Sequence, residues 1–348
     1  MWEERLTRRD ALRVGGGTVL AALSGGIAGC GGALPGGDGG TDRLDFVRWL
    51  PAPGEIETEG GEALEHYRAS FTDLSARRDS DVLPVRENAV YRSFGPAAGV
   101  SMADVETLVF SDVAHVLTGQ FDAESVADEL ESGGRRGGEQ YPAYSEESTH
   151  GAFTFYASGE PVRVFRSVPV VVGVSDGAVV LAPGSGPVED RTDRSRAVID
   201  AKAGDVDRYA GANEDLDRLV DELGDGIGAS VRTHPETEET EPPPPGIGLT
   251  RRFEGQVAYG GVTRSDGGEV SETMVKLFAS ADAVPSDELD AWVEELNDQG
   301  GDGGLYRSFS ASESGRAWTL TAEIDTSAFS DTPTPTEPGP PTPTEPES

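Results

Sequence analysis

Apolar residues recur at helical spacing in several parts of the chain. In one of them, Leu216, Leu219, Val220 and Leu223 stand at positions i, i+3, i+4 and i+7, which places them on one face of an α-helix. Gly224 follows, where a glycine commonly ends a helix. Similar spacing predicts further helices over residues 63–78, 122–131, 192–202 and 286–296.

Shorter runs rich in β-branched and aromatic residues lie between these helices and predict β-strands. Asp266-Gly267-Gly268 is the expected turn between two of them. Because several strands follow one another without an intervening helix, we expect an α+β protein with antiparallel sheets. The expected strands cover residues 114–117, 152–156, 168–182, 256–261, 270–280, 305–310 and 318–324.

A change of composition divides the chain into two units. Residues 235–246 (PETEETEPPPPG) are acidic and rich in proline, so we expect an extended, solvent-exposed linker or loop there. This segment separates an α+β domain over residues 44–234 from a second α+β unit over residues 247–330.

The two units share a sequence pattern in their helices. Residues 126–130 (VADEL) precede Gly133-Gly134, and residues 292–296 (WVEEL) precede Gly300-Gly301. A divergent duplication of a ferredoxin-like β-α-β-β unit explains the pattern, and chance similarity between two acidic helices explains it as well. The predicted fold is therefore α+β, with two small antiparallel-sheet and helix units.

The first thirty residues have the parts of an export signal in the expected order. Arg8 and Arg9 stand in the stretch TRRDALR, and a weakly apolar segment rich in glycine and alanine runs from there to the tetrapeptide IAGC. This segment is shorter than the ~20 apolar residues of a membrane-spanning helix. The pattern predicts a twin-arginine signal peptide over residues 1–29, cleaved between Gly29 and Cys30.

The chain is strongly acidic. It contains 28 Lys and Arg against 63 Asp and Glu, which gives a net charge of −35, and its lysines are Lys202 and Lys276 alone. A surface with this charge repels itself at low ionic strength. Because binding to phosphates needs clustered Lys or Arg, the composition excludes nucleic acid as a partner.

With this leader and this composition, the chain resembles twin-arginine-exported lipoproteins of halophilic archaea. The resemblance implies folding in the cytoplasm, export by the twin-arginine translocase, a lipid on Cys30, and attachment to the outer face of the cell membrane. Residues 30–43 would then be a flexible tether from the lipid. The Thr/Pro-rich residues 331–348 are expected to form a disordered tail.

Cys30 is the only cysteine of the chain. An intramolecular disulfide is therefore impossible, and a lipid on Cys30 would leave the mature protein without a thiol. Blue-copper sites, iron–sulfur clusters and thiolate zinc sites all need one. We expect no cofactor.

One motif matches G-x-S-x-G, the nucleophile elbow of serine hydrolases. It runs from Gly173 to Gly177 and would make Ser175 the nucleophile. An elbow needs a strand before the serine and a helix after it, whereas valine-rich runs stand on both sides here. Asp176-Gly177 is instead a preferred two-residue hairpin turn, so we expect Ser175 to be an ordinary strand residue.

The remaining candidate residues lack catalytic or metal-binding spacing. Arg191, Arg194 and Arg196 are interleaved with Asp190 and Asp193, which favours a solvated charge cluster over an anion site. The four histidines show no H-x-H, H-x-x-x-H or H-E-x-x-H spacing; they are His66, His115, His150 and His234.

These observations favour a lipid-anchored, non-enzymatic protein at the surface of a halophile, which binds or supports other envelope components through a groove or a sheet edge of its second unit. Its partner would be an envelope protein or a small molecule. Two alternatives stay open. A solute-binding lipoprotein of a transporter needs two lobes around a polar cleft, and an exported hydrolase needs titratable groups gathered in one pocket.

We expect the mature protein to need high salt to fold. At molar salt the Debye length is about 3 Å, so repulsion between the surface carboxylates is largely screened. Circular dichroism should show a folded protein at molar salt and loss of structure at millimolar salt. Equal spectra and equal melting temperatures under the two conditions would contradict this expectation.

Overall fold

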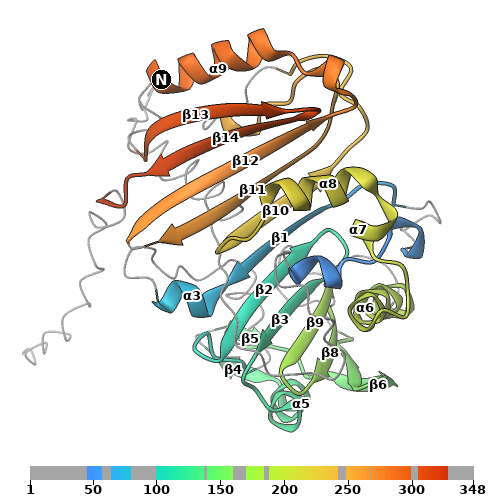
Figure 1. Ribbon diagram of the computed structural model, residues 1–348. Helices are drawn as coiled ribbons and strands as arrows, with labels where there is room; N and C mark the ends of the chain where they lie inside the picture. Colours follow the sequence, from blue (N-terminus) through green and yellow to red (C-terminus); the bar gives the residue numbers. More distant parts are fainter. Residues whose placement is uncertain are drawn as a thin grey trace, which may run out of the picture.

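The computed structural model describes residues 45–56, 64–79, 99–136, 139–159, 170–183, 188–241, 248–266, 268–298 and 305–327. These residues form one open antiparallel sheet of 12 strands and a separate two-stranded hairpin, β4–β5 (Figure 1). The strand order in the large sheet is β13-β14-β12-β11-β10-β1-β2-β3-β9-β8-β7-β6. The signal peptide (1–29), the tether (30–43) and the tail (331–348) that the sequence predicts lie outside the described residues.

The strands have the following bounds: β1 Arg68–Asp73, β2 Val105–Ser111, β3 His115–Gly119, β4 Gly134–Arg136, β5 Glu139–Tyr141, β6 Ser145–His150, β7 Phe153–Ala157, β8 Val170–Ser175, β9 Ala178–Pro183, β10 Gly228–Thr233, β11 Gln256–Asp266, β12 Glu269–Phe278, β13 Tyr306–Ser314 and β14 Ala317–Ile324. The α-helices are α3 Leu74–Asp79, α5 Ala123–Ser132, α6 Val188–Ala203, α7 Tyr209–Ala212, α8 Glu214–Leu223 and α9 Ser286–Asp298. Two of the 3₁₀ turns matter below, η1 Asp45–Trp49 and η3 Gly248–Thr250.

The predicted pair of small ferredoxin-like units is wrong, because a single sheet runs through both halves of the chain. The physical reason is the pairing of β10 with β11, which sets Val231 of the first expected unit opposite Gly260 of the second. On its other side β10 pairs with β1, which pairs in turn with β2. The backbone ladder therefore continues from one expected unit into the other.

The predicted helix over residues 63–78 is also wrong. The segment forms β1 and then the short helix α3, which begins at Leu74. Tyr67, Ala69 and Phe71 are buried in one core cluster, which is the two-residue period of a strand. Tyr67, Phe71 and Leu74 also fit helical spacing, and this coincidence produced the error.

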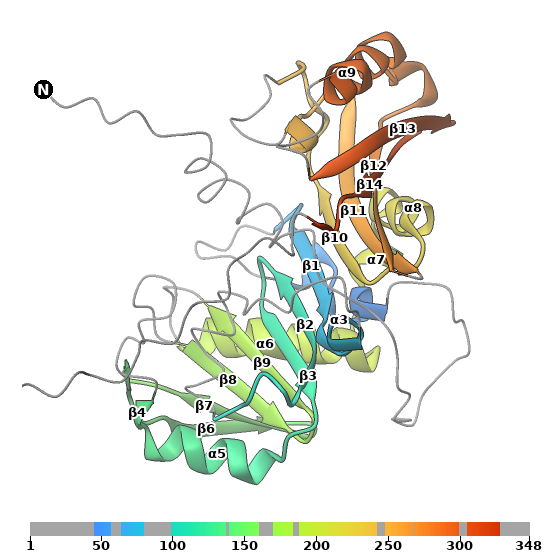
Figure 2. The ribbon, with the colours of Figure 1, turned by 90° about the vertical axis from the view of Figure 1, so that its left-hand side faces the viewer.

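The two faces of the sheet carry different helices. On one face, α6, α7, α8 and η1 cover a single apolar core that includes Val180, Val231 and Val275. On the other face, one core lies under α5 and another lies beside α9. Figure 2 shows α5 and α9 at opposite ends of the molecule.

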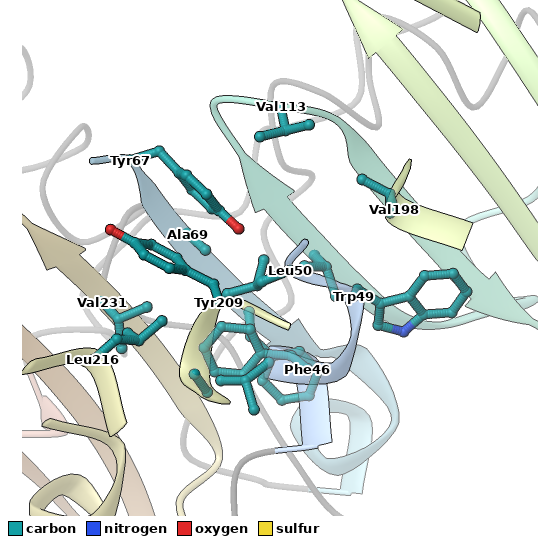
Figure 3. Close-up of a cluster of buried hydrophobic side chains, with 14 of the residues drawn as sticks. Phe46, Trp49, Leu50, Tyr67, Ala69, Val113, Val198, Tyr209, Leu216 and Val231 are labelled. Carbon is teal, nitrogen blue, oxygen red and sulfur yellow. The ribbon is translucent and has the colours of Figure 1, made fainter. Parts of the chain in front are cut away.

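Aromatic side chains hold the middle of the sheet together (Figure 3). Phe46 of η1 stacks on Phe71 of β1 at 5.3 Å between ring centroids, and Tyr67 stacks on Tyr209 of α7 at 4.5 Å. The Tyr67 hydroxyl donates to the carbonyl oxygen of Pro51 at 2.6 Å. Segments that lie far apart in the sequence therefore pack against the central strands.

Residues close in the chain determine several element ends. Asp122 caps α5 by accepting from the Ser125 N–H, and Asn213 caps α8 by accepting from the Leu216 N–H. Gly224 follows α8 with a positive φ of 59°. In the described part of the chain, no helix has the length and apolar character needed to cross a membrane.

Phe46→Ala tests whether the sheet is one cooperative unit. Phe46 is 2% exposed, and truncating a buried phenylalanine costs about 3–5 kcal/mol. Native-state hydrogen exchange should show this loss of stability both in β3 and in β14. Glu124→Ala, at an exposed position of α5, should change stability by less than about 0.5 kcal/mol. A loss confined to one of the two strands would favour separate units.

Candidate functional site

The four residues that the sequence assigns to export and lipidation lie outside the described residues. They are Arg8, Arg9, Gly29 and Cys30. Their roles stay predictions from the sequence, and the candidate site must be sought in the folded part.

The G-x-S-x-G motif forms a hairpin turn, as the sequence predicts. Ser175 ends β8 and pairs with Ala178 of β9 across Asp176-Gly177, and Gly177 has a φ of 70°. Ser175 is buried, and its hydroxyl donates to the carbonyl oxygen of Ala178 at 3.4 Å. Asp176 accepts from the Ala123 N–H at 3.1 Å, so the turn helps to hold the start of α5.

The structure does not gather the four histidines into one site. His115 lies beside Phe110, and burial lowers its pKa to about 4. His150 contacts the Asp200 carboxylate at 2.6 Å. Only two of the four come near each other: His66 contacts the hydroxyl of Thr233, and His234 is the next residue along the chain.

The three arginines of α6 separate according to their place on the helix. Arg196 pairs with Asp193 at 3.0 Å, as a solvated cluster predicts. Arg191, by contrast, is 3% exposed, so it belongs to the packed face of α6. The three side chains therefore do not form one surface group.

A groove of about 420 Å³ lies at the start of α5, where the β8–β9 turn is tied to the helix. Phe121 and Val126 contribute apolar surface, and Asp104, Asp122 and Asp128 contribute carboxylates. The hydrogen bond from the Ser125 N–H to Asp122 lowers the pKa of that carboxyl group. At least one acid of the groove is thus committed to holding the helix.

The sheet ends in two edge strands, β6 and β13. An edge strand carries outward N–H and C=O groups that can pair with another chain. In β6, the adjacent Glu146 and Glu147 are exposed, and the ladder has an irregularity between Glu146 and Ser148. Charge and a bulge are two common means of protecting an edge.

The outer edge of β13 is protected differently and only in part. The side chain of Asn297 in α9 accepts from the Phe309 N–H at 3.0 Å and donates to the Phe309 carbonyl oxygen at 3.2 Å. The amide thus takes the place that a neighbouring strand would occupy. Because outward and inward backbone groups alternate along an antiparallel strand, the N–H and C=O of Ala311 and Glu313 point the same way as those of Phe309.

The remaining part of β13 is open. Residues 310–314 (SASES) are exposed on both faces of the strand. Gly315, with a φ of 61°, lies in the turn that joins Ser314 to Ala317 of β14. The edge is therefore regular from Phe309 to the hairpin, blocked by Asn297 at one residue, and lined by small side chains beyond it.

Helix α9 is placed beside β13 by an apolar core and by a buried lysine. Lys276 of β12 lies 5.1 Å from the ring centroid of Trp292 in α9, and 5.5 Å and 5.8 Å from those of Phe253 and Tyr259. Its ammonium donates to the carbonyl oxygen of Arg251 at 2.6 Å. These contacts fasten α9 and the segment after η3 to the sheet.

Sequence reasoning missed Asn297, Ala311 and Lys276 as residues of interest. Lys276 carries a signal in hindsight, since it is one of two lysines and stands in the apolar run MVKLF. The stretch SASES also lacks the apolar alternation of a covered strand. Asn297 gives no signal, because its role depends on the position of β13 relative to α9.

In the folded part that the structure describes, no three His, Cys, Asp or Glu side chains come together as metal ligands. No family model and no curated protein matches the chain. Two solved structures, titled crystal forms III and I of TP0453, are similar at 10% and 9% identity with TM-scores of 0.43 and 0.41. The two matches cover 80% and 82% of this chain, and each covers 96% of the matched chain. A likeness at this level carries no argument about function.

Lys276→Met should remove a pH dependence of stability. Burial, followed by the charge of Arg251, lowers the pKa of Lys276 from 10.5 to about 7. Between these values the unfolded chain binds more protons at this residue than the folded one, so stability rises with pH by at most about 1.4 kcal/mol per unit. Denaturant unfolding across this range should show the rise in the wild type and in Lys202→Met, and lose it in Lys276→Met. Parallel curves of stability against pH for all three proteins would contradict the lowered pKa of Lys276.

Proposed function

We propose that this protein is a lipid-anchored, non-enzymatic component of the cell surface, which binds an envelope partner by strand addition at the open edge of β13. The export and anchoring part of the proposal is supported by Arg8, Arg9, Gly29 and Cys30 of the leader. The binding part rests on one observation, the regular and exposed edge of β13 beyond Phe309.

Strand addition fits the chemistry of this edge. An incoming extended segment gains main-chain hydrogen bonds, and pockets for its side chains supply specificity. At β13 the main-chain groups of Ala311 and Glu313 are available, and the flanking serines leave room for either orientation of the segment. Asn297 stops the pairing at Phe309, so the register of the added strand is limited to the hairpin end.

The acidic surface shapes the same interaction. Glu313 is itself engaged, since it accepts from the Ser286 hydroxyl at 2.7 Å. At high salt, screening removes most of the repulsion between exposed charges. Backbone pairing, which depends little on ionic strength, then carries the binding.

Ala311→Pro tests the proposal directly. Proline lacks the outward N–H of residue 311, and it is tolerated at a strand edge where that group faces solvent. A photo-crosslinking residue at position 311 on intact cells should capture a defined envelope protein, whereas the same residue at position 149 of β6 should not. Binding of the purified partner should be lost in Ala311→Pro and kept in Thr149→Pro.

Two further variants separate anchoring from binding. Cys30→Ser should release the protein from the membrane fraction while purified binding stays intact. Asn297→Ala exposes the backbone groups of Phe309 and should strengthen binding. Unchanged binding in Ala311→Pro, with the fold intact by circular dichroism, would end the strand-addition proposal. Retention of Cys30→Ser at the membrane would end the anchoring proposal.

A further inference from the structure

Glu272 is a buried acid in which one of the two carboxyl oxygens has a hydrogen-bond partner and the other has none among the described residues. It lies in β12 on the side of α9 and is 2% exposed. Its Oε2 accepts from the hydroxyl of Tyr306 at 2.6 Å. Its Oε1 is buried and has no hydrogen-bond partner in the described part of the chain. Such an atom is costly to bury as part of a carboxylate.

The groups around Glu272 supply no compensating charge. Its cross-strand neighbours are Thr263 of β11 and Ala322 of β14, and Tyr306 of β13 reaches it from the edge. Among these, Tyr306 alone titrates. Arg307, the residue after Tyr306, pairs with Asp325 instead.

The cation on the same face of β12 is too distant to help. Lys276 is four residues along the strand, roughly 13 Å away at 3.3 Å per residue, and its ammonium donates to carbonyl oxygens near η3. An ionised Glu272 would therefore be an isolated charge in an apolar core that includes Val270, Met274 and Ile324.

We propose that Glu272 is a proton-controlled latch for the β13 edge, which holds the start of β13 on the sheet when protonated and loosens it when ionised. Tyr306, which donates to Glu272, is the first residue of β13, and the β13–β14 ladder is irregular between Tyr306 and Ser308. This end of the strand has little regular pairing to resist change. Water drawn to an ionised Glu272 would enter here.

The direction of the pH effect follows from burial. Burial raises the pKa of Glu272 from 4.5 to about 7, and the hydrogen bond from Tyr306 opposes this rise. The folded state then binds more protons than the unfolded state between these values. The stabilisation by the neutral acid is complete below about pH 4.5 and is lost as the pH rises to 7. Over this range the folding equilibrium constant should fall by up to about two orders of magnitude.

Unfolding titrations at constant molar salt measure this directly. Glu272→Gln should lack the fall between pH 4.5 and 7, whereas Glu323→Gln, at an exposed position of the neighbouring strand β14, should keep it. Hydrogen exchange of the wild type, corrected for its intrinsic pH dependence, should show protection of β13 falling more steeply with pH than that of β6.

Tyr306→Phe provides a second variant if Glu272→Gln does not fold. It removes the hydrogen bond that favours the ionised acid, so the pH at which stability falls should move upward. A Glu272 that titrates near pH 4.5 by carbon-13 NMR of its carboxyl group would overturn the latch, as would equal pH dependence in the wild type and Glu272→Gln. The latch needs no partner on β13, so it can fail while strand addition stands, and the reverse also holds.

Discussion

The structure depends on the pairing of β1 with β10. This contact joins Arg68–Asp73 to Gly228–Thr233, which lie far apart in the chain, and it turns two groups of strands into one sheet. Aromatic stacking of Phe46 on Phe71 and of Tyr67 on Tyr209 covers the same place. Because loop closure must precede contacts of such long range, we infer that the sheet forms as a whole only when β1 is inserted. The rest of the architecture, including its two edges, follows from that insertion.

Each edge is managed by a different part of the sequence. β6 carries its own protection in Glu146 and Glu147, whereas β13 depends on α9 for the amide of Asn297. α9 in turn is held by the apolar core around Trp292 and by Lys276. Both lysines of this acidic chain lie against tryptophan, Lys202 at 5.3 Å from the ring centroid of Trp49 and Lys276 at 5.1 Å from that of Trp292. Each of the two lysines is thus placed where an ammonium group can pack on an aromatic ring.

Local chemistry was readable from the sequence, and long-range pairing was not. The helix end at Gly224 and the turn at Asp176-Gly177 depend on residues close in the chain, so pattern and turn chemistry predicted them. The single sheet depends on which strands neighbour β10, and the pattern of a strand does not specify its partner. The open part of β13 and the role of Asn297 depend on the same tertiary placement. For this reason the sequence predicted a groove or a sheet edge of the second unit as the binding surface, without indicating which strand forms that edge.

Glu272 and Lys276 show why the β13 side of the sheet is the side that can respond. They share one face of β12, yet the spacing along the strand keeps them from forming an ion pair. Side by side, each would have compensated the other, and the core beside α9 would contain a neutral pair. Because they are apart, the burial of each carries its own desolvation cost. That of Lys276 falls where α9 is held to the sheet, and that of Glu272 falls where β13 begins. The two desolvation costs on this face of β12 thus lie beside the edge whose main-chain groups remain open.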